Sequence, residues 1–133
     1  MRYLLDTHTF IWALSAPEKL PAKARTAIED PKSEVFVSSV SFWEIAIKVR
    51  SRRLAPVGKP TSSTVEASES MGFRPISLTP VEAATHGDLG EDTHFDPFDR
   101  MLIWQAISRN MILVSGDEQF QRFAADGLKL LWK

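Results

Sequence analysis

Short apolar segments that alternate with helix-favouring segments are the feature that most restricts the fold of this chain. Tyr3 to Leu5 and Met111 to Ser115 are apolar runs of the kind that is buried on both faces of a parallel sheet. Val35 to Ser38 and Arg74 to Leu78 predict two further strands, and Leu128 to Trp132 predicts an edge strand. We therefore expect an α/β fold, a three-layer α/β/α sandwich with a mainly parallel sheet of about five strands.

Capping residues, prolines and apolar periodicity predict a helix in each interval between these strands. The predicted helices cover Phe10 to Leu14, Ala22 to Glu29, Phe42 to Arg50, Thr61 to Met71, Thr79 to about His86, Asp96 to Ile107 and Glu118 to Ala125. In the third of these helices, Phe42, Ile45, Ala46 and Val49 are spaced to form one buried face.

Composition excludes several classes of protein. A chain of 133 residues with 44% hydrophobic residues has the size of one domain, so we expect a single domain over residues 1–133. A formal net charge of -1 means that any nucleic-acid contact must come from a local basic patch. The absence of cysteine excludes disulfides and thiolate nucleophiles, and no apolar run approaches the roughly 18 residues of a membrane span, so we expect a cytoplasmic protein without a membrane anchor.

Four acids occur where a parallel sheet can bring them together. Asp6 follows the first strand, Glu44 lies in the helix after the second, Asp99 lies in the first turn of the helix from Asp96, and Asp117 follows the strand from Met111. Ligands bind at the carboxyl ends of the strands in open α/β sheets. Clustered carboxylates repel one another unless a divalent cation neutralises them, and hard oxygen ligands suit Mg²⁺ or Mn²⁺ rather than zinc.

Each acid also has a purely structural explanation. Asp6 and Asp117 can cap helices, Ser41 to Glu44 fits a capping box, Glu44 and Lys48 fit a favourable helical ion pair, and Asp99 complements a helix dipole. Capping alone does not explain why strong acids follow both the first and the fourth strand. Their joint placement therefore favours an acidic site.

Several polar residues beside these acids have open roles. Asp96, directly before Pro97, is expected to be a helix N-cap. Ser38 and Ser115 close strands, where a hydroxyl could hold a metal-bound water, although Ser115 to Glu118 also fits a capping box. We expect solvated or hydrogen-bonded roles for His8 and His94, which lie beside favoured acids.

Positive charge concentrates in one segment of the chain. The basic residues there are Lys48, Arg50, Arg52, Arg53 and Lys59. Cations at a helix C-terminus are favourable by themselves, so this segment is either a solvated helix end or a surface for a nucleic-acid backbone.

Four segments carry a resemblance to a known family. Leu4–His8, Val37–Lys48, His94–Ile103 and Val114–Phe120 resemble, in order, the motifs of PIN-domain ribonucleases, and most closely those of the VapC-type toxins of toxin–antitoxin pairs. The resemblance covers almost the whole chain and implies a single PIN-like domain. It also implies a Mg²⁺- or Mn²⁺-dependent endoribonuclease.

The resemblance assigns roles to the acids. Asp6 and Asp99 would be the core metal ligands, Glu44 a direct or water-mediated ligand, and Asp117 the holder of a second metal or its water. Ser115 matches the hydroxyl position of the family beside Asp117, and Thr7 and Asp96 are expected to be supporting positions. Independently of the resemblance, the concentration of positive charge leads us to expect RNA contacts from Lys48, Arg50, Arg52 and Arg53. An activated water would attack the RNA phosphate in line and leave a 5′-phosphate.

The resemblance further implies an RNA substrate, a small antitoxin as partner and a homodimer, with DNA binding left to the antitoxin. Phosphatases of the haloacid-dehalogenase type place a second Asp where this chain has His8, and receiver domains need a late lysine at a strand end, so both disagree with the sequence. The remaining alternative is a non-catalytic PIN-like module that binds RNA or protein. The complete set of four acids favours the enzyme.

Overall fold

The computed structural model describes residues 1–56 and 61–133, and its elements follow the predicted order. The strands are β1 (Arg2–Leu5), β2 (Glu34–Ser38), β3 (Arg74–Ile76), β4 (Ile112–Val114) and β5 (Lys129–Leu131). The α-helices are α1 (Thr7–Ser15), α2 (Ala22–Glu29), α3 (Ser39–Arg50), α4 (Ser63–Ser70), α5 (Pro80–Thr85) and α6 (Pro97–Ser108). Three 3₁₀-helices complete the described elements: η1 (Pro17–Lys19), η2 (His86–Asp88) and η3 (Glu118–Asp126).

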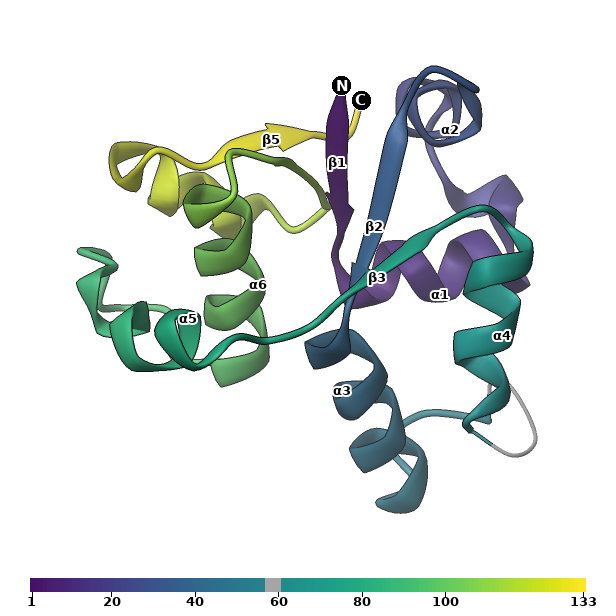
Figure 1. The fold of residues 1–133 in the computed structure, drawn as a ribbon, viewed down its shortest axis with the longest axis horizontal. Coiled ribbons are helices and arrows are strands. Elements are labelled where there is room, and N and C mark those ends of the chain that lie inside the picture. The colour runs from purple at the N-terminus through teal and green to yellow at the C-terminus, as the bar shows by residue number, and fades with distance from the viewer. Residues whose placement is uncertain (57–60) are drawn as a thin grey trace.

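The five strands form one sheet in the order β3-β2-β1-β4-β5, and every neighbouring pair is parallel. β1 is central, with Leu4 opposite Phe36 of β2 and Leu113 of β4. Because all strands run the same way, their carboxyl ends lie along one edge of the sheet. The segments that follow β1, β2 and β4 all begin at this edge, as Figure 1 shows for α1 after β1 and for α3 after β2.

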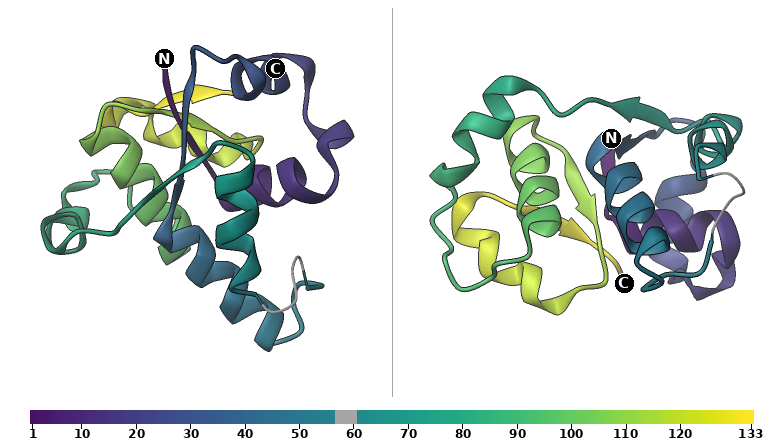
Figure 2. Two further views of the ribbon diagram at one scale, coloured as in Figure 1. Left: turned by 45° about the vertical axis from the view of Figure 1, so that its right-hand side comes forward. Right: turned by 90° about the horizontal axis from the view of Figure 1, so that it is seen from below.

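Successive side chains of the central strand supply two separate cores, one on each face of the sheet. Tyr3 and Leu5 pack with Phe10 of α1, while Leu4 packs with Ile103 of α6. Helices α1, α2 and α4 lie on one side of the strands, and α5, α6 and η3 lie on the other (Figures 1 and 2). The predicted three-layer α/β/α sandwich is confirmed, and its sheet is entirely parallel.

Helix α3 differs from its prediction in its start and in its buried face. Ser38 is its N-cap, with Oγ accepting a hydrogen bond from the Val40 N–H at 3.0 Å, so the predicted capping box from Ser41 is wrong. Ala46, predicted to be buried, is exposed, whereas Glu44 is buried beside Ile45. The cause is that α3 packs against both α1 and α6, which turns a polar strip of the helix inward.

The last helical segment is a 3₁₀-helix and not the predicted α-helix. Phe120 and Phe123, three residues apart, are both fully buried in the core beneath α6. A helix with three residues per turn places such residues directly above one another. Gly127, with a φ of 97°, then ends η3 in the left-handed conformation.

Across the described residues, no helix has the length and apolar character required to span a membrane.

Candidate functional site

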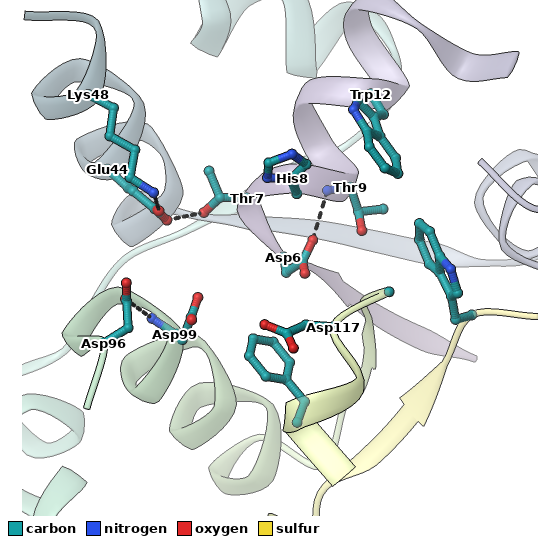
Figure 3. A pocket seen from close by; sticks show the side chains of 13 residues that line it. Asp6, Thr7, His8, Thr9, Trp12, Glu44, Lys48, Asp96, Asp99 and Asp117 are labelled. Carbon is teal, nitrogen blue, oxygen red and sulfur yellow. Dashed lines mark hydrogen bonds and ion pairs between the residues drawn. The ribbon is translucent and has the colours of Figure 1, made fainter. Parts of the chain in front are cut away.

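The acids predicted to converge all line one pocket of about 440 Å³ at the carboxyl edge of the sheet (Figure 3). The pocket is lined by Asp6, Thr7, His8, Thr9, Trp12, Glu44, Lys48, Asp96, Asp99, Gly116, Asp117, Phe120 and Trp132. These residues come from α1, α3, α6, η3 and the segments beside them. The pocket therefore unites segments that lie more than a hundred positions apart in the sequence.

Asp6 occupies the floor of this arrangement at the end of the central strand. Only 7% of its surface is exposed, and its Oδ1 accepts a hydrogen bond from the Thr9 N–H at 2.7 Å. Asp6 is thus the N-cap of α1, which confirms the capping role that the sequence predicted as an alternative to metal binding. Burial raises the pKa of the Asp6 carboxyl, against the lowering effect of its hydrogen bonds. Capping and membership of the pocket are compatible, because only one carboxylate oxygen is used by the cap.

Asp99 lies in the first turn of α6, where its carboxylate faces the pocket. Burial raises its pKa to about 6, and repulsion from Asp96 and Glu44 adds to this effect. The ring Nε2 of His94 lies 3.0 Å from Asp99 Oδ2 and opposes the shift. The buried His94 ring packs edge-on against Phe120, at a centroid distance of 5.7 Å, which holds the imidazole in place.

Glu44 enters the pocket from α3 and is almost completely buried. Its Oε1 accepts a hydrogen bond from Thr7 Oγ1 at 2.6 Å, and its Oε2 forms an ion pair with Lys48. The predicted Glu44–Lys48 pair is therefore confirmed. Thr7 Oγ1 also lies 3.0 Å from Ser41 Oγ, so Ser41 belongs to the contacts behind the pocket and not to the helix cap.

Asp117 and Asp96 both line the pocket and cap the helical segments that follow them. Asp117 Oδ1 accepts a hydrogen bond from the Gln119 N–H at 2.9 Å, and Asp96 Oδ1 accepts one from the Asp99 N–H at 3.0 Å. The cap predicted for Asp96 is confirmed. Ser115 Oγ accepts a hydrogen bond from the Asp117 N–H at 3.1 Å, so the alternative capping box from Ser115 is wrong.

Two other polar residues differ in their distance from the pocket. Ser38 does not line it, because its hydroxyl donates to Gln105 Oε1 at 2.5 Å beneath the sheet edge. The structure thus argues against a water-holding role for Ser38. His8 is exposed and lines the pocket, with its ring edge-on to Trp12 at a centroid distance of 5.2 Å.

The predicted basic residues divide into two groups. Lys48 and Arg53 line a second pocket of about 360 Å³, which shares Thr7, His8, Glu44 and Lys48 itself with the acidic one. Arg50 and Arg52 are exposed and line neither pocket. Lys59 lies outside the described residues.

Trp12 and Trp132 were not predicted at the site, yet their indoles line the acidic pocket beside the carboxylates. Trp12 lies one helical turn after His8, so helical periodicity could have placed it at the same edge of the sheet. No local pattern points to Trp132, which reaches the pocket because β5 pairs with β4.

The chemistry of the donors fits a divalent cation. Carboxylate oxygens dominate the polar lining of the pocket, and two of the carboxyls, Asp6 and Asp99, have raised pKa values that a cation would lower. Within the described residues, however, no three acidic or histidine side chains gather closely enough to form a ready-made metal centre. The four acids line the pocket without clustering at one point.

Comparison with known proteins agrees with this architecture. The family model described as "PIN domain" matches residues 3–126. A chain in the crystal structure of VapBC2 from Rickettsia felis bound to a promoter DNA fragment has a TM-score of 0.74 at 18% identity, with 100% of both chains covered. A chain of VapBC-1 from nontypeable Haemophilus influenzae has a TM-score of 0.61 at 19% identity, covering 98% of this chain and 97% of that one.

A chain of FitAcB from Neisseria gonorrhoeae has a TM-score of 0.58 at 19% identity, covering 97% of this chain and 96% of that one. Among curated proteins, none matches the sequence. The structural similarities, all below 25% identity, establish a shared fold, and the family model covers most of the chain. The resemblance drawn from the four motifs is confirmed, and the chain belongs to the PIN domain family.

Proposed function

We propose that this chain is a metal-dependent endoribonuclease and the toxin of a toxin–antitoxin pair. The observation that carries the proposal is the single pocket onto which Asp6, Glu44, Asp99 and Asp117 converge from four separate segments. Capping explains Asp6 and Asp117 one at a time, but it does not explain why Glu44 is buried beside a carboxyl with a raised pKa. Membership of the PIN family and similarity to chains of VapBC and FitAcB structures support the proposal.

Asp6 and Asp99 are the proposed ligands of Mg²⁺ or Mn²⁺, with Glu44 as a direct or water-mediated ligand and Asp117 supporting a second metal or its water. When bound, such an ion supplies a Lewis acid and lowers the pKa of a water that can attack a phosphodiester. Asp6 and Asp99 are suited to this role because desolvation raises the pKa of each carboxyl, so that the ionised form of each is costly without a cation.

The surrounding side chains position these acids. His94 orients Asp99, Thr7 orients Glu44, and Asp96 begins the helix that presents Asp99. The Ser115 hydroxyl holds the backbone N–H of Asp117 and thereby fixes the loop that carries this acid. All four contacts restrict side-chain or backbone motion at the edge of the pocket.

Positive charge for the RNA backbone would come from Lys48, Arg50, Arg52 and Arg53. Lys48 and Arg53 are the best placed of these, since they line the pocket that adjoins the acids. Contacts of this kind set position along the RNA and carry no sequence information.

The proposed partners are an RNA substrate, a small antitoxin and a second copy of the chain, in the cytoplasm. We propose that DNA binding in such an assembly belongs to the antitoxin, consistent with the promoter DNA bound by the Rickettsia felis VapBC2 assembly. Light scattering of the purified chain tests the homodimer. A gel-shift assay in which the chain alone binds promoter DNA would contradict the division of roles.

Cleavage of a total-RNA pool by the purified chain tests the nuclease function. The reaction is run with Mg²⁺ or Mn²⁺, with EDTA, and with the variants Asp6→Asn and Asp92→Asn. Asp92 is exposed, does not line the acidic pocket and serves as the matched control. We expect discrete fragments with 5′-phosphates from the wild type and the control, and none with EDTA or Asp6→Asn.

Cleavage that persists in EDTA, or at the wild-type rate in Asp6→Asn, would contradict the proposed site. If the wild type neither cleaves RNA nor binds metal in calorimetry, the alternative of a non-catalytic PIN-like binding module is favoured instead.

A further inference from the structure

Two indoles from opposite ends of the chain line the pocket beside the acids. Trp12 on α1 and Trp132 after β5 are both half-buried, with ring centroids 6.1 Å apart and ring planes inclined by 37°. Each ring packs in part against the core and leaves the rest of its surface to the pocket. Trp12 lies across the pocket from Glu44 and Lys48 (Figure 3). The indoles thus add an aromatic surface to a pocket whose other lining is largely charged.

The position of Trp132 depends on a glycine in the acidic loop. A Cβ atom at Gly116 would lie between 2.6 and 2.9 Å from three atoms of the indole, closer than real contacts allow. Only a residue without a side chain lets the ring lie directly on the backbone between Ser115 and Asp117. The aromatic surface is therefore fixed relative to Asp117.

Cations flank both sides of the pocket. Lys19 Nζ lies 5.8 Å from the centroid of the Trp12 ring, and this lysine is exposed. On the far side, Lys48 and Arg53 line the adjoining pocket. Aromatic surface together with flanking cations suits a ligand that combines flat apolar rings with phosphates, which is the chemistry of single-stranded nucleic acid.

We propose that Trp12 and Trp132 form a stacking platform for an unpaired nucleobase of the RNA, an inference that rests on the proposed nuclease function and extends it. The base stacks on the indoles, and the phosphodiester next to it extends over the acids. A base inside a duplex has both faces covered by its neighbours and cannot use this surface.

Binding of two single-stranded probes tests the platform. One is a dye-labelled oligoadenylate of twelve nucleotides, and the other is a phosphodiester polymer of the same length with abasic tetrahydrofuran residues in place of nucleosides. The variant Asp6→Asn, with Mg²⁺ present, serves as the parent protein so that no cleavage occurs during fluorescence anisotropy titrations. We expect the parent to bind oligoadenylate about tenfold more tightly than the abasic polymer, because stacking on an aromatic side chain has an effect of this order.

Substitutions in the parent locate the effect. Trp12→Leu and Trp132→Leu should each bring the affinity ratio of the two probes close to one, while Trp12→Phe, which keeps an aromatic face, should retain part of it. Trp43→Leu is the control, because Trp43 is 59% exposed, contacts Phe98 and does not line the pocket. Circular dichroism verifies folding. If a leucine variant does not fold, the partial loss of the affinity ratio expected for Trp12→Phe serves as the test instead.

Equal affinity of the parent for the two probes, or an unchanged ratio in Trp12→Leu and Trp132→Leu, would overturn the platform. The cleavage assay with the wild type is read separately. Discrimination between the probes without any cleavage supports the base site and contradicts the nuclease function. Cleavage without discrimination contradicts the platform alone.

Discussion

Replacing Asp99 by asparagine is expected to stabilise the metal-free protein while removing a proposed metal ligand. Burial raises the pKa of the Asp99 carboxyl to about 6 from its ordinary 3.8, and the nearby charges of Asp96 and Glu44 add to this. Between these two pH values the folded protein holds a proton that the unfolded chain has released. Stability therefore falls as the pH rises from about 3.8 to about 6, and the whole loss is present at pH 8.

The size of this loss follows from the two pKa values. A pKa of about 6 against 3.8 corresponds to about 3 kcal/mol. Because a quarter of the Asp99 side chain is exposed to water (25%), we expect Asp99→Asn to recover about 1–3 kcal/mol of unfolding free energy at pH 8. Asparagine keeps an oxygen that can accept a hydrogen bond from His94, so this contact need not be lost.

Urea denaturation in EDTA at pH 8 and pH 4 measures the effect. The gain at pH 8 should largely disappear at pH 4, where the wild-type carboxyl is protonated in the folded state. Asp92→Asn, at an exposed position, should change the unfolding free energy by less than about 0.5 kcal/mol at either pH. A neutral or destabilising Asp99→Asn at pH 8, or an equal gain at both pH values, would refute the reasoning.

Three further predictions concern the core, the acidic loop and the metal. Although burial opposes it, hydrogen bonds from Arg109 lower the pKa of Glu82 to about 2 from 4.5. Glu82→Gln should therefore lower the unfolding free energy by about 3 kcal/mol at pH 7. This difference from the wild type should shrink as the pH falls from about 4.5 towards 2. A difference that does not change with pH would contradict this explanation. Gly116→Ala should lower the unfolding free energy measured in urea by about 1–3 kcal/mol, because the added methyl meets the Trp132 ring. A variant as stable as the wild type would show that Trp132 packs less closely on Gly116. Saturating Mn²⁺ should raise the melting temperature of the wild type but not of Asp6→Asn, whereas an equal rise in both proteins would exclude Asp6 as a ligand.

Much of the fold and the site could be predicted from local patterns. Continuous apolar runs predicted a parallel sheet, and Thr79 to Glu82 forms the expected capping box at the start of α5. Asp96 caps α6 and points Asp99 at the pocket, as expected from a residue that precedes proline. These features depend on neighbours within about four positions, where backbone geometry leaves few choices.

The sequence alone determined the order of strands and helices and the four acids at the ends of strands and in the adjoining helices. Tertiary structure decided which helix faces are buried: apolar periodicity predicted Ala46 inside, yet contact with α1 and α6 buries Glu44 instead. It also brought Trp132 to the pocket that Asp6 lines, because β5 pairs with β4 at the edge of the sheet. Local patterns record the preferences of a segment, whereas the neighbours of a side chain are set by which distant segments pack together.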